Sequence, residues 1–267
     1  MILKFLKRLL TNSAEFDTFL QAWGQIGCFV SQEKETVLLK ISGESLSGEG
    51  GYGLTRSPLE FIGEEVVSVS HTHQLAIVVG GGNIIRGAKL KQEVFRKDVA
   101  SADYMGMLST MINALALQAF LENEYGLDTR VMSALEARQV CEPYIVRRAL
   151  SHLEKGRIVI CAGGIGTPNF STDITMVIRA NEIGAKIALK GTKVDGIYDK
   201  DPKQHADAKF LEEISYLDYL NQKLSIVDAT AVAQAMNHGI TIRVFNFLTK
   251  GNLRRVLIDK NIGSVIH

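Results

Sequence analysis

The chain has 267 residues and 46% of them are hydrophobic, which is enough to bury one substantial core. Its 30 basic and 29 acidic side chains give a formal net charge of +1, so no overall field favours nucleic acid or an anionic membrane surface. The three cysteines are widely spaced and include no CxxC pair. This argues against a disulfide framework or a zinc site and fits reduced thiols in the cytoplasm.

The first ten residues, MILKFLKRLL, mix basic and apolar side chains in an amphipathic pattern. A short helix of this kind can lie on a membrane, serve as a targeting tail or cap its own protein. No apolar run is long enough to span a membrane, so a transmembrane helix is not expected. We interpret residues 1–33 as an extension without a catalytic role and residues 34–267 as a single domain, and we do not expect membrane contact.

Short β-branched runs alternate with longer helical stretches from Thr36 onward. This alternation predicts an α/β sandwich whose central sheet is mostly parallel. The runs are nearly continuous in apolar residues, as expected of strands that are covered on both faces. The expected strands are residues 37–42, 75–80, 130–134, 157–163, 186–190 and 240–246, and the expected helices are residues 58–71, 103–124, 143–155, 171–184, 229–238 and 250–257.

The expected helix at residues 103–124 is apolar almost all round. Such a helix needs contacts on more than one side, so it belongs either in the core or in a subunit interface. One apolar stripe consists of Leu108, Ile112, Leu115 and Ala119, whereas Met107, Met111 and Leu117 lie elsewhere on the helix.

Glycine-rich turns follow several expected strands, at the carboxyl ends where open α/β folds bind ligands. In LLKISGESLSGEGGYGL, Lys40 stands in the strand, and Ser42 and Gly43 follow it. Glycine lets backbone amides approach phosphate oxygens, and the lysine adds a point charge. The GxxxxGK[ST] spacing of a Walker A loop is missing, and for this segment alone an exposed lysine beside a flexible turn is the commoner explanation.

The second turn, VVGGGNIIRG, places three glycines at residues 80–82, followed by Asn83 and Arg86. Bare amides at a helix start and an arginine one turn later suit a phosphate group. The GxGxxG fingerprint of a dinucleotide site is matched only loosely, so a nicotinamide cofactor is not expected. A tight turn with a solvated Arg86 is the alternative.

Two later segments add further polar groups. In AGGIGTPNFSTD, glycines lead to Ser171, Thr172 and Asp173, which can cap a helix or bind a nucleotide. In ALKGTKVDGIYDKDP, lysines and aspartates surround Tyr198. Charges of both signs beside an aromatic ring can hold a triphosphate, a metal ion and adenine together, so this segment favours a functional role.

Together these four segments resemble the amino acid kinase superfamily and, within it, the bacterial uridylate kinases. The likeness covers about residues 35–266 and includes DYMGML, IVDATA around Asp228, and ITIRVFN. The resemblance implies a three-layer α/β/α sandwich in which ATP and UMP lie end to end across the carboxyl edge of the sheet. It implies a cytoplasmic enzyme that transfers the γ-phosphoryl group of ATP to UMP, giving UDP and ADP, in de novo pyrimidine nucleotide synthesis.

The resemblance also assigns residues to the ATP half and to the reacting centre. The residues around the reacting centre are Lys40, Asp173, Lys190 and Asp228. Contacts with the ATP phosphates are implied for Lys40, Ile41, Ser42, Gly43, Gly82 and Arg86, and contacts with adenosine for Thr192, Tyr198 and Asp201.

A third group of residues is assigned to UMP, with Thr172 near its phosphate. This group consists of Gly81, Asp103, Ile165, Gly166, Thr167, Pro168, Asn169, Phe170, Ser171 and Thr172.

The mechanism that the resemblance implies is positional and electrostatic. Lys40 and Lys190 would stabilise the charge on the transferred group while Mg²⁺ bridges the ATP oxygens, and no metal-binding side chain is assigned. No general base is needed, because the phosphate of UMP, with a second pKa of about 6, is already an anionic nucleophile. Relatives are hexamers built from dimers, and many are activated by GTP and inhibited by UTP. The SGEGGYGL segment, Ser47 to Leu54, resembles the stretch tied to the GTP response.

Two departures from the family pattern affect details. GIGTPNFSTD replaces the usual GTGNPFFTTD, which leaves open how Thr167 and Asn169 contribute to uracil recognition. KGTKVDG replaces KATKVDG, and Gly191 should loosen the end of its strand.

Three alternatives differ from this interpretation. An acetylglutamate kinase would lack DYMGML and an acid corresponding to Asp103. A non-catalytic nucleotide sensor is disfavoured by the presence of Lys40 and of the 190–201 loop. The third is a membrane-associated enzyme recruited by MILKFLKRLL.

Overall fold

The computed structural model describes residues 34–48, 50–85, 94, 98–202 and 204–267. By its contacts the chain divides into Met1–Lys34 and Glu35–His267, and the fold below is that of the second unit. The amphipathic pattern of the first ten residues and the predicted phosphate ligand Arg86 both lie outside the described residues.

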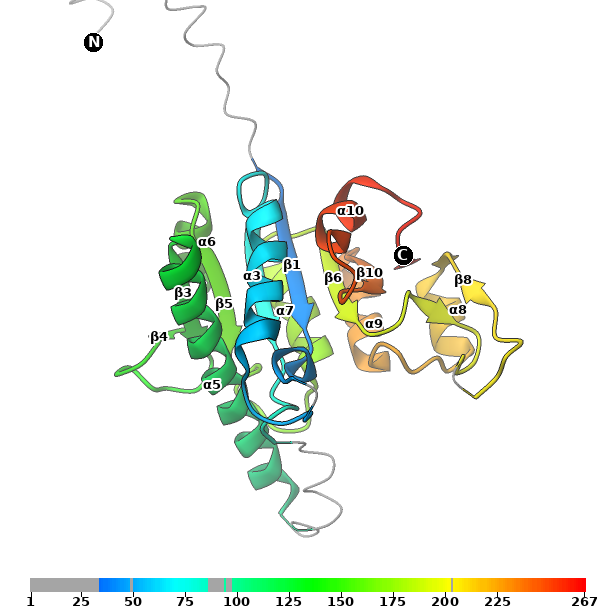
Figure 1. Cartoon of the computed structure of the whole chain (residues 1–267). Coiled ribbons are helices and arrows are strands. Elements are labelled where there is room, and N and C mark those ends of the chain that lie inside the picture. Colours follow the sequence, from blue (N-terminus) through cyan, green and yellow to red (C-terminus); the bar gives the residue numbers. More distant parts are fainter. Residues whose placement is uncertain (1–33, 49, 86–93, 95–97, 203) are drawn as a thin grey trace, which may run out of the picture. The chain divides into compact units, whose positions relative to one another are not determined.

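A nine-stranded sheet forms the centre of this unit (Figure 1). All neighbouring strands in it are parallel except β10 and β11, which confirms the predicted α/β fold with a mostly parallel sheet. Across the sheet the order is β4 (Glu142–Pro143), β3 (Thr129–Ser133), β5 (Ile158–Ala162), β2 (Gln74–Val79), β1 (Thr36–Ile41), β6 (Ile187–Thr192), β10 (Thr241–Asn246), β11 (Ser264–Ile266) and β9 (Glu213–Ile214), and β7 (Ile197–Tyr198) pairs with β8 (Phe210–Leu211) in a separate small sheet.

Helices cover both faces of the large sheet, and the side chains beneath them form two apolar clusters. Alternation along β1 places Val37, Leu39 and Ile41 in one cluster and Leu38 in the other, so Lys40 faces the same side as Leu38. The first cluster packs under α3 (Arg56–Ser70), α5 (Val99–Tyr125) and α10 (Asn252–Ile258), and the second under α6 (Val146–Glu154), α7 (Thr172–Glu182), α8 (Tyr216–Asn221) and α9 (Ala229–His238).

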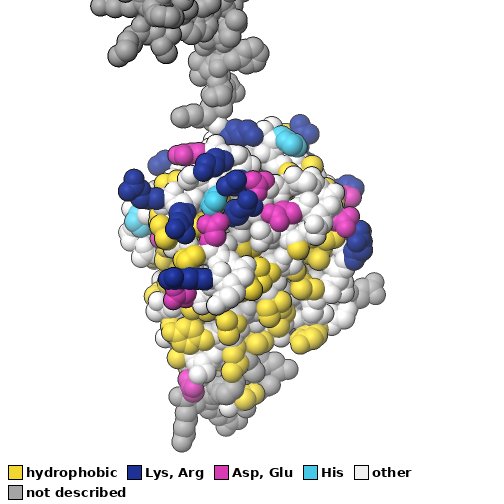
Figure 2. Space-filling view, turned by 90° about the vertical axis from the view of Figure 1, so that its left-hand side faces the viewer, with side chains coloured by type: hydrophobic (Ala, Val, Ile, Leu, Met, Phe, Trp, Pro, Cys, Tyr) yellow, Lys and Arg dark blue, Asp and Glu magenta, His cyan; other side chains and the backbone are white. Residues whose placement is uncertain are grey.

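Helix α5 is partly a core helix and partly exposed. Its length and apolar composition would suit a membrane span, and half of its most apolar window is buried within the fold. Met111 and Leu117 are buried, whereas Leu108 and Ile112 are 51% and 49% exposed. Figure 2 shows hydrophobic side chains gathered over the lower part of the face that carries α5. The helix therefore serves the core on one side and leaves an apolar stripe on the other.

The four strands that precede the predicted ligand-binding turns are adjacent in the order β5, β2, β1, β6. Because these strands are parallel, their carboxyl ends meet at one edge of the sheet. Strand β6 stays paired with β10 through Thr192, whereas its pairing with β1 ends at Lys190, so the loosening expected at Gly191 stays a prediction. A Cβ atom at Gly191 would lie 2.9 Å from Cβ of Phe247, so the glycine allows close packing at this point.

Candidate active site

Two lysines share one buried carboxylate at this edge of the sheet. Lys40 of β1 and Lys190 of β6 are directly paired in the sheet register. Nζ of Lys40 lies 3.3 Å from Oδ1 of Asp173, at the start of α7, and Nζ of Lys190 donates a hydrogen bond to Oδ2 of the same residue. Each of the three residues is 7–8% exposed. The predicted reacting centre is thus a buried Lys–Asp–Lys group.

Burial and neighbouring charges shift the pKa values of Asp173 and Lys190. Burial alone would raise the pKa of the Asp173 carboxyl, but the cations of Lys40 and Lys190 lower it below its ordinary value. Burial lowers the pKa of Lys190, and Asp173 opposes that change. Lys190 also donates to the Ile226 carbonyl, and the backbone N–H of Asp228 donates to Oδ2 of Asp173 at 3.1 Å. The side chain of Asp228 instead caps α9 through the N–H of Thr230.

The first two glycine turns touch each other. Ser42 caps the 3₁₀ helix η1 (Gly43–Leu46), and its hydroxyl accepts a hydrogen bond from the N–H of Glu44 at 3.3 Å. A side chain at Gly43 would lie 2.6 Å from the backbone nitrogen of Gly82. A side chain at Gly81 would lie 2.7 Å from the carbonyl of Gly106 in α5. Only glycine allows the turns after β1 and β2 to pack this closely against each other and against α5.

The AGGIGTPNFSTD segment, which follows β5, contacts α5 before it enters α7. The carboxylate of Asp103 accepts a hydrogen bond from the N–H of Asn169 at 2.8 Å, and Asn169 has a positive φ of 70°. Ser171 caps α7, so the helix-capping role that the sequence allows is confirmed. These contacts place Thr172 at the amino end of α7, beside Asp173, where a phosphate group is favoured.

A pocket of about 390 Å³ lies among the first three turns, and we call it the cleft pocket. It includes the predicted residues Lys40, Ser42, Gly43, Gly81, Gly82, Asp103, Phe170, Ser171 and Thr172. Residues 165–169 are not part of its lining. Its wall also includes Gly80, Ile85, Ala102, Gly106, Met107, Thr110, Gly164 and Thr175, which sequence reasoning did not single out as ligands.

A second pocket, of about 430 Å³, lies beside the loop that follows β6, and we call it the loop pocket. Tyr198 and Asp201, both predicted, line one wall, and residues 222–226 line the other. Ile226 of that wall accepts the hydrogen bond from Lys190. The cleft pocket therefore reaches Lys40, and the loop pocket is linked to Lys190 through Ile226.

Two predicted ATP contacts have structural roles of their own. The side chain of Ile41 is fully buried in the core, and its carbonyl accepts a hydrogen bond from Gly80. The hydroxyl of Thr192 donates to the carbonyl of Val194 at 2.7 Å and lies 3.1 Å from the carbonyl of Phe245. Neither residue lines the cleft pocket or the loop pocket. Residues 222–225 were missed because they follow α8 and carry no glycine-rich motif, whereas Ile226 opens the IVDATA segment but was not singled out as a ligand.

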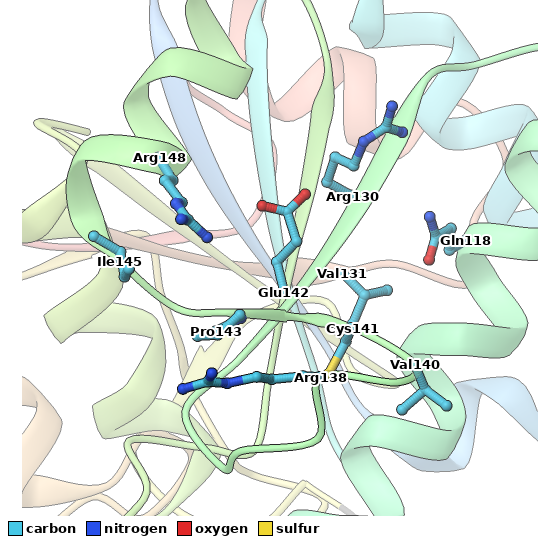
Figure 3. A pocket seen from close by; sticks show the side chains of 10 residues that line it. All are labelled: Gln118, Arg130, Val131, Arg138, Val140, Cys141, Glu142, Pro143, Ile145 and Arg148. Carbon is cyan, nitrogen blue, oxygen red and sulfur yellow. The ribbon is translucent and has the colours of Figure 1, made fainter.

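A third pocket, of about 540 Å³, lies near β3 and β4, apart from the Lys–Asp–Lys group (Figure 3). Arg130, Arg138 and Arg148 line it together with Glu142. We call it the arginine pocket. None of the residues predicted for ATP or UMP is in its lining.

Known proteins resemble this chain over most of its length. The model of the amino acid kinase family matches residues 35–246. The uridylate kinase of Rubrobacter xylanophilus is 50% identical over 232 residues, which cover 86% of this chain and 90% of that protein. The uridylate kinase of Wolinella succinogenes is 47% identical over 234 residues, which cover 87% and 96%. The crystal structure of UMP kinase from Bacillus anthracis matches with a TM-score of 0.83 and 35% identity, over 87% of this chain and 96% of that one.

Proposed function

The chain belongs to the amino acid kinase family as one of its uridylate kinases, which phosphorylate UMP with ATP, and we propose how its residues share that reaction. The observation that carries the assignment is the Lys40–Asp173–Lys190 group, which connects the cleft pocket to the loop pocket. Two nucleotides that meet at their phosphates need two such pockets with cations between them.

UMP occupies the cleft pocket in this proposal. Its phosphate lies near Thr172 at the start of α7, where the helix dipole favours an anion. Gly81 supplies a backbone amide, and Asp103 accepts hydrogen bonds from the nucleoside. Residues 170–172 line the pocket on one side of the nucleotide, and Asp103 holds the segment that precedes them through the N–H of Asn169.

ATP places its adenosine in the loop pocket, against Tyr198 and Asp201. Thr192 then acts by holding the start of the loop in shape. The triphosphate extends towards Lys40 and the turn formed by Ser42 and Gly43, and Gly82 contributes from the neighbouring turn. Ile41 contributes only through its backbone, because its side chain is in the core. Arg86 keeps its predicted role as a phosphate ligand.

In the reaction, a phosphate oxygen of UMP attacks the γ-phosphorus of ATP, and the bond to the β–γ bridging oxygen breaks, releasing ADP. Lys40 and Lys190 stabilise the negative charge on the transferred group and on the leaving phosphate. Asp173 holds the two ammonium groups in place through its ion pairs with them. Asp228 supports this arrangement through its backbone N–H, which bonds to Asp173.

The residues at the site also fit a Mg²⁺ ion carried on ATP. Among the described residues, no group of three His, Cys, Asp or Glu side chains could hold a metal ion alone. Mg²⁺ in kinases usually keeps phosphate and water ligands and takes only one or two carboxylates. Oδ1 of Asp173 accepts no hydrogen bond, but it already pairs with Nζ of Lys40 at 3.3 Å, so phosphate oxygens and water would supply the ligands of the ion. The ion would neutralise charge on the phosphates of ATP.

The proposal extends to assembly and regulation. The exposed stripe of α5 around Leu108 and Ile112 is the surface we assign to subunit contact in a homohexamer. Activation by GTP and inhibition by UTP need a site for a triphosphate, and the cations of the arginine pocket suit its charge. We place the enzyme in the cytoplasm, with residues 1–33 as an extension to the single domain at 34–267.

A coupled assay of ADP release tests the assignment. With ATP as donor, we expect UMP to be phosphorylated far faster than CMP, dUMP or N-acetylglutamate. Faster ADP release with N-acetylglutamate would contradict the assignment to the uridylate kinases. ADP release that does not depend on any acceptor would indicate ATP hydrolysis instead of phosphoryl transfer.

A further inference from the structure

Two asparagines form a fully buried pair beneath the second glycine turn. Asn113 lies in the middle of helix α5 and is 0% exposed, and Asn83 directly follows the turn and is 1% exposed. Nδ2 of Asn113 donates to Oδ1 of Asn83 at 2.7 Å, and Nδ2 of Asn83 donates back to Oδ1 of Asn113 at 3.1 Å. A buried amide is costly unless its hydrogen bonds are made, so this pair is well specified.

Both amides also bond outward, and they reach two different segments. Nδ2 of Asn113 donates to the carbonyl of Gly80 at 2.7 Å, within the turn itself. Nδ2 of Asn83 donates to the carbonyl of Gly53 at 2.7 Å, and the N–H of Gly53 donates to the carbonyl of Asn83 at 2.9 Å. Each NH₂ group therefore uses both of its hydrogens. The pair connects Gly53, the turn after β2 and helix α5.

The same pair sets the distance between the first two turns. A side chain at Gly43 would lie 2.7 Å from Oδ1 of Asn83 and 2.7 Å from the carbonyl of Gly80. The Asn83 amide thus fills the space against which the turn after β1 packs. Neither asparagine lines the cleft pocket, so neither side chain is placed to bind a nucleotide directly.

We propose that Asn83 and Asn113 are a positioning pair that holds the turn Gly80–Gly82 in its phosphate-binding geometry and couples it to Gly53. The proposal rests on the assignment of Gly81 and Gly82 to the phosphates of the two nucleotides. Phosphoryl transfer needs in-line geometry, so a small displacement of these amides affects the transition state more than ground-state binding. The pair acts on the reaction through the backbone of the turn.

The first test replaces Asn113 with leucine, which is similar in size but cannot donate or accept. We expect Asn113→Leu to lower kcat about tenfold or more, with smaller changes in the KM values for ATP and UMP. Leu121→Ala is the matched control, because it removes buried volume from the same helix about 12 Å further along. It should lower Tm at least as much as Asn113→Leu while keeping kcat within about twofold of the wild type.

The second test uses the partly exposed end of the network, where a substitution leaves the core intact. Gly53 has a φ of +74° and open space around its Cβ position, and Gly126, at the end of α5, has a φ of +65° and open space as well. Alanine therefore introduces similar backbone strain at both positions. We expect Gly53→Ala to lower kcat about threefold and Gly126→Ala to leave it unchanged. In protein that already carries Asn83→Ala, adding Gly53→Ala should cause no further fall in kcat.

The outcomes separate this proposal from the function on which it rests. Wild-type protein that does not phosphorylate UMP would contradict the assigned function itself. Active wild type with an equally active Asn113→Leu variant would overturn the positioning role, as would equal kcat values for Gly53→Ala and Gly126→Ala. If Asn113→Leu does not fold, the comparison of Gly53→Ala with Gly126→Ala decides the question.

Discussion

Lys40 and Lys190 stand opposite each other on neighbouring parallel strands, and both contact the carboxylate of Asp173. Two ammonium groups this close repel each other unless an anion lies between them. The buried carboxylate therefore makes the pairing of the two lysines tolerable. In the proposed reaction, the phosphates of ATP and UMP bring further negative charge to the same place, so cations prepared in advance are available to the transition state.

Replacing Lys40 with alanine should remove stabilisation that is needed mainly in the transition state. We expect Lys40→Ala to lower kcat about a hundredfold or more and to raise the KM for UMP much less. Steady-state kinetics with both substrates varied would measure this. Lys250→Ala is the control, because Lys250 is an exposed lysine paired with Glu64 and lines none of the pockets described above. An unchanged kcat in Lys40→Ala would remove Lys40 from the mechanism.

Asp173→Asn keeps the shape of the side chain but removes the charge between the lysines. Two buried cations would then lack their counter-ion, so we expect kcat to fall about a hundredfold and the free energy of unfolding to fall by about 3 kcal/mol. Urea unfolding and initial rates on the same preparation measure both effects. Asp218→Asn is the control, because Asp218 is an exposed residue in the first turn of α8 whose carboxylate accepts a hydrogen bond from the N-cap Ser215; it should change neither rate nor stability by a comparable amount. A variant as active as the wild type would show that the lysines need no anion.

The depressed pKa of Asp173 predicts a pH dependence of stability. The two lysines hold its folded-state pKa below the value of about 3.9 found in unfolded chains, so the folded protein binds this proton more weakly than the unfolded chain does. Its contribution is complete above the unfolded pKa and is lost as the pH falls through the folded pKa. The stability difference between wild type and Asp173→Asn should be constant near neutrality and shrink below about pH 4. A difference that grows with acidity would contradict this sign.

The architecture of the large sheet was predictable because its strands are buried on both faces. VLLKI and RIVICA are nearly continuous apolar runs, and β1 and β5 lie within a residue or two of their predicted bounds. The strands β4, β7, β8 and β9 were not predicted, since each has two residues and no periodicity to detect. β11 and α8 were missed as well. Their positions depend on packing at the edge of the sheet beyond β10, which short sequence patterns do not encode.

The candidate site was predictable as a set of turns but not as a set of contacts. The position of glycines after strands indicated which edge of the sheet binds phosphate, and Lys40, Asp173 and Lys190 meet there. The sequence did not show that one carboxylate serves both lysines, because those residues are up to 150 positions apart. Asn113 was also missed. The sequence does not show which of the polar residues of α5 has a buried partner, and only the fold brings Asn83 beside Asn113.

The apolar stripe of α5 predicts an effect on assembly. Leu108→Glu and Ile112→Glu would place charges in the proposed subunit contact, so we expect the doubly substituted protein to lose the six-chain species and form smaller ones. Size-exclusion chromatography with light scattering measures the mass directly. Leu217→Glu is the control, because Leu217 is a 60% exposed leucine on α8 that we assign to no interface. A double variant that stays hexameric would show that subunits meet elsewhere.

The two pockets should be separable by kinetics, because each is assigned to one nucleotide. Asp103 lines the cleft pocket and holds the 165–172 segment through the N–H of Asn169. Removing its carboxylate takes away charged hydrogen bonds on the UMP side only, so Asp103→Ala should raise the KM for UMP about tenfold and leave the KM for ATP nearly unchanged. Initial rates over a matrix of both substrates measure the two constants together.

The reciprocal variant tests the loop pocket and serves as the control for Asp103→Ala. Tyr198 lines that pocket, and its ring packs edge-on against Phe210 at 5.3 Å between centroids. Tyr198→Ala removes an aromatic wall, so we expect the KM for ATP to rise about tenfold while the KM for UMP stays nearly constant. If Tyr198→Ala instead raised the KM for UMP alone, the assignment of the two nucleotides to the two pockets would have to be reversed. If either variant raised both KM values equally, the assignment of one nucleotide to each pocket would have to be abandoned. A KM raised only for UMP in Asp103→Ala and only for ATP in Tyr198→Ala would agree with two nucleotides that meet at the Lys40–Asp173–Lys190 group.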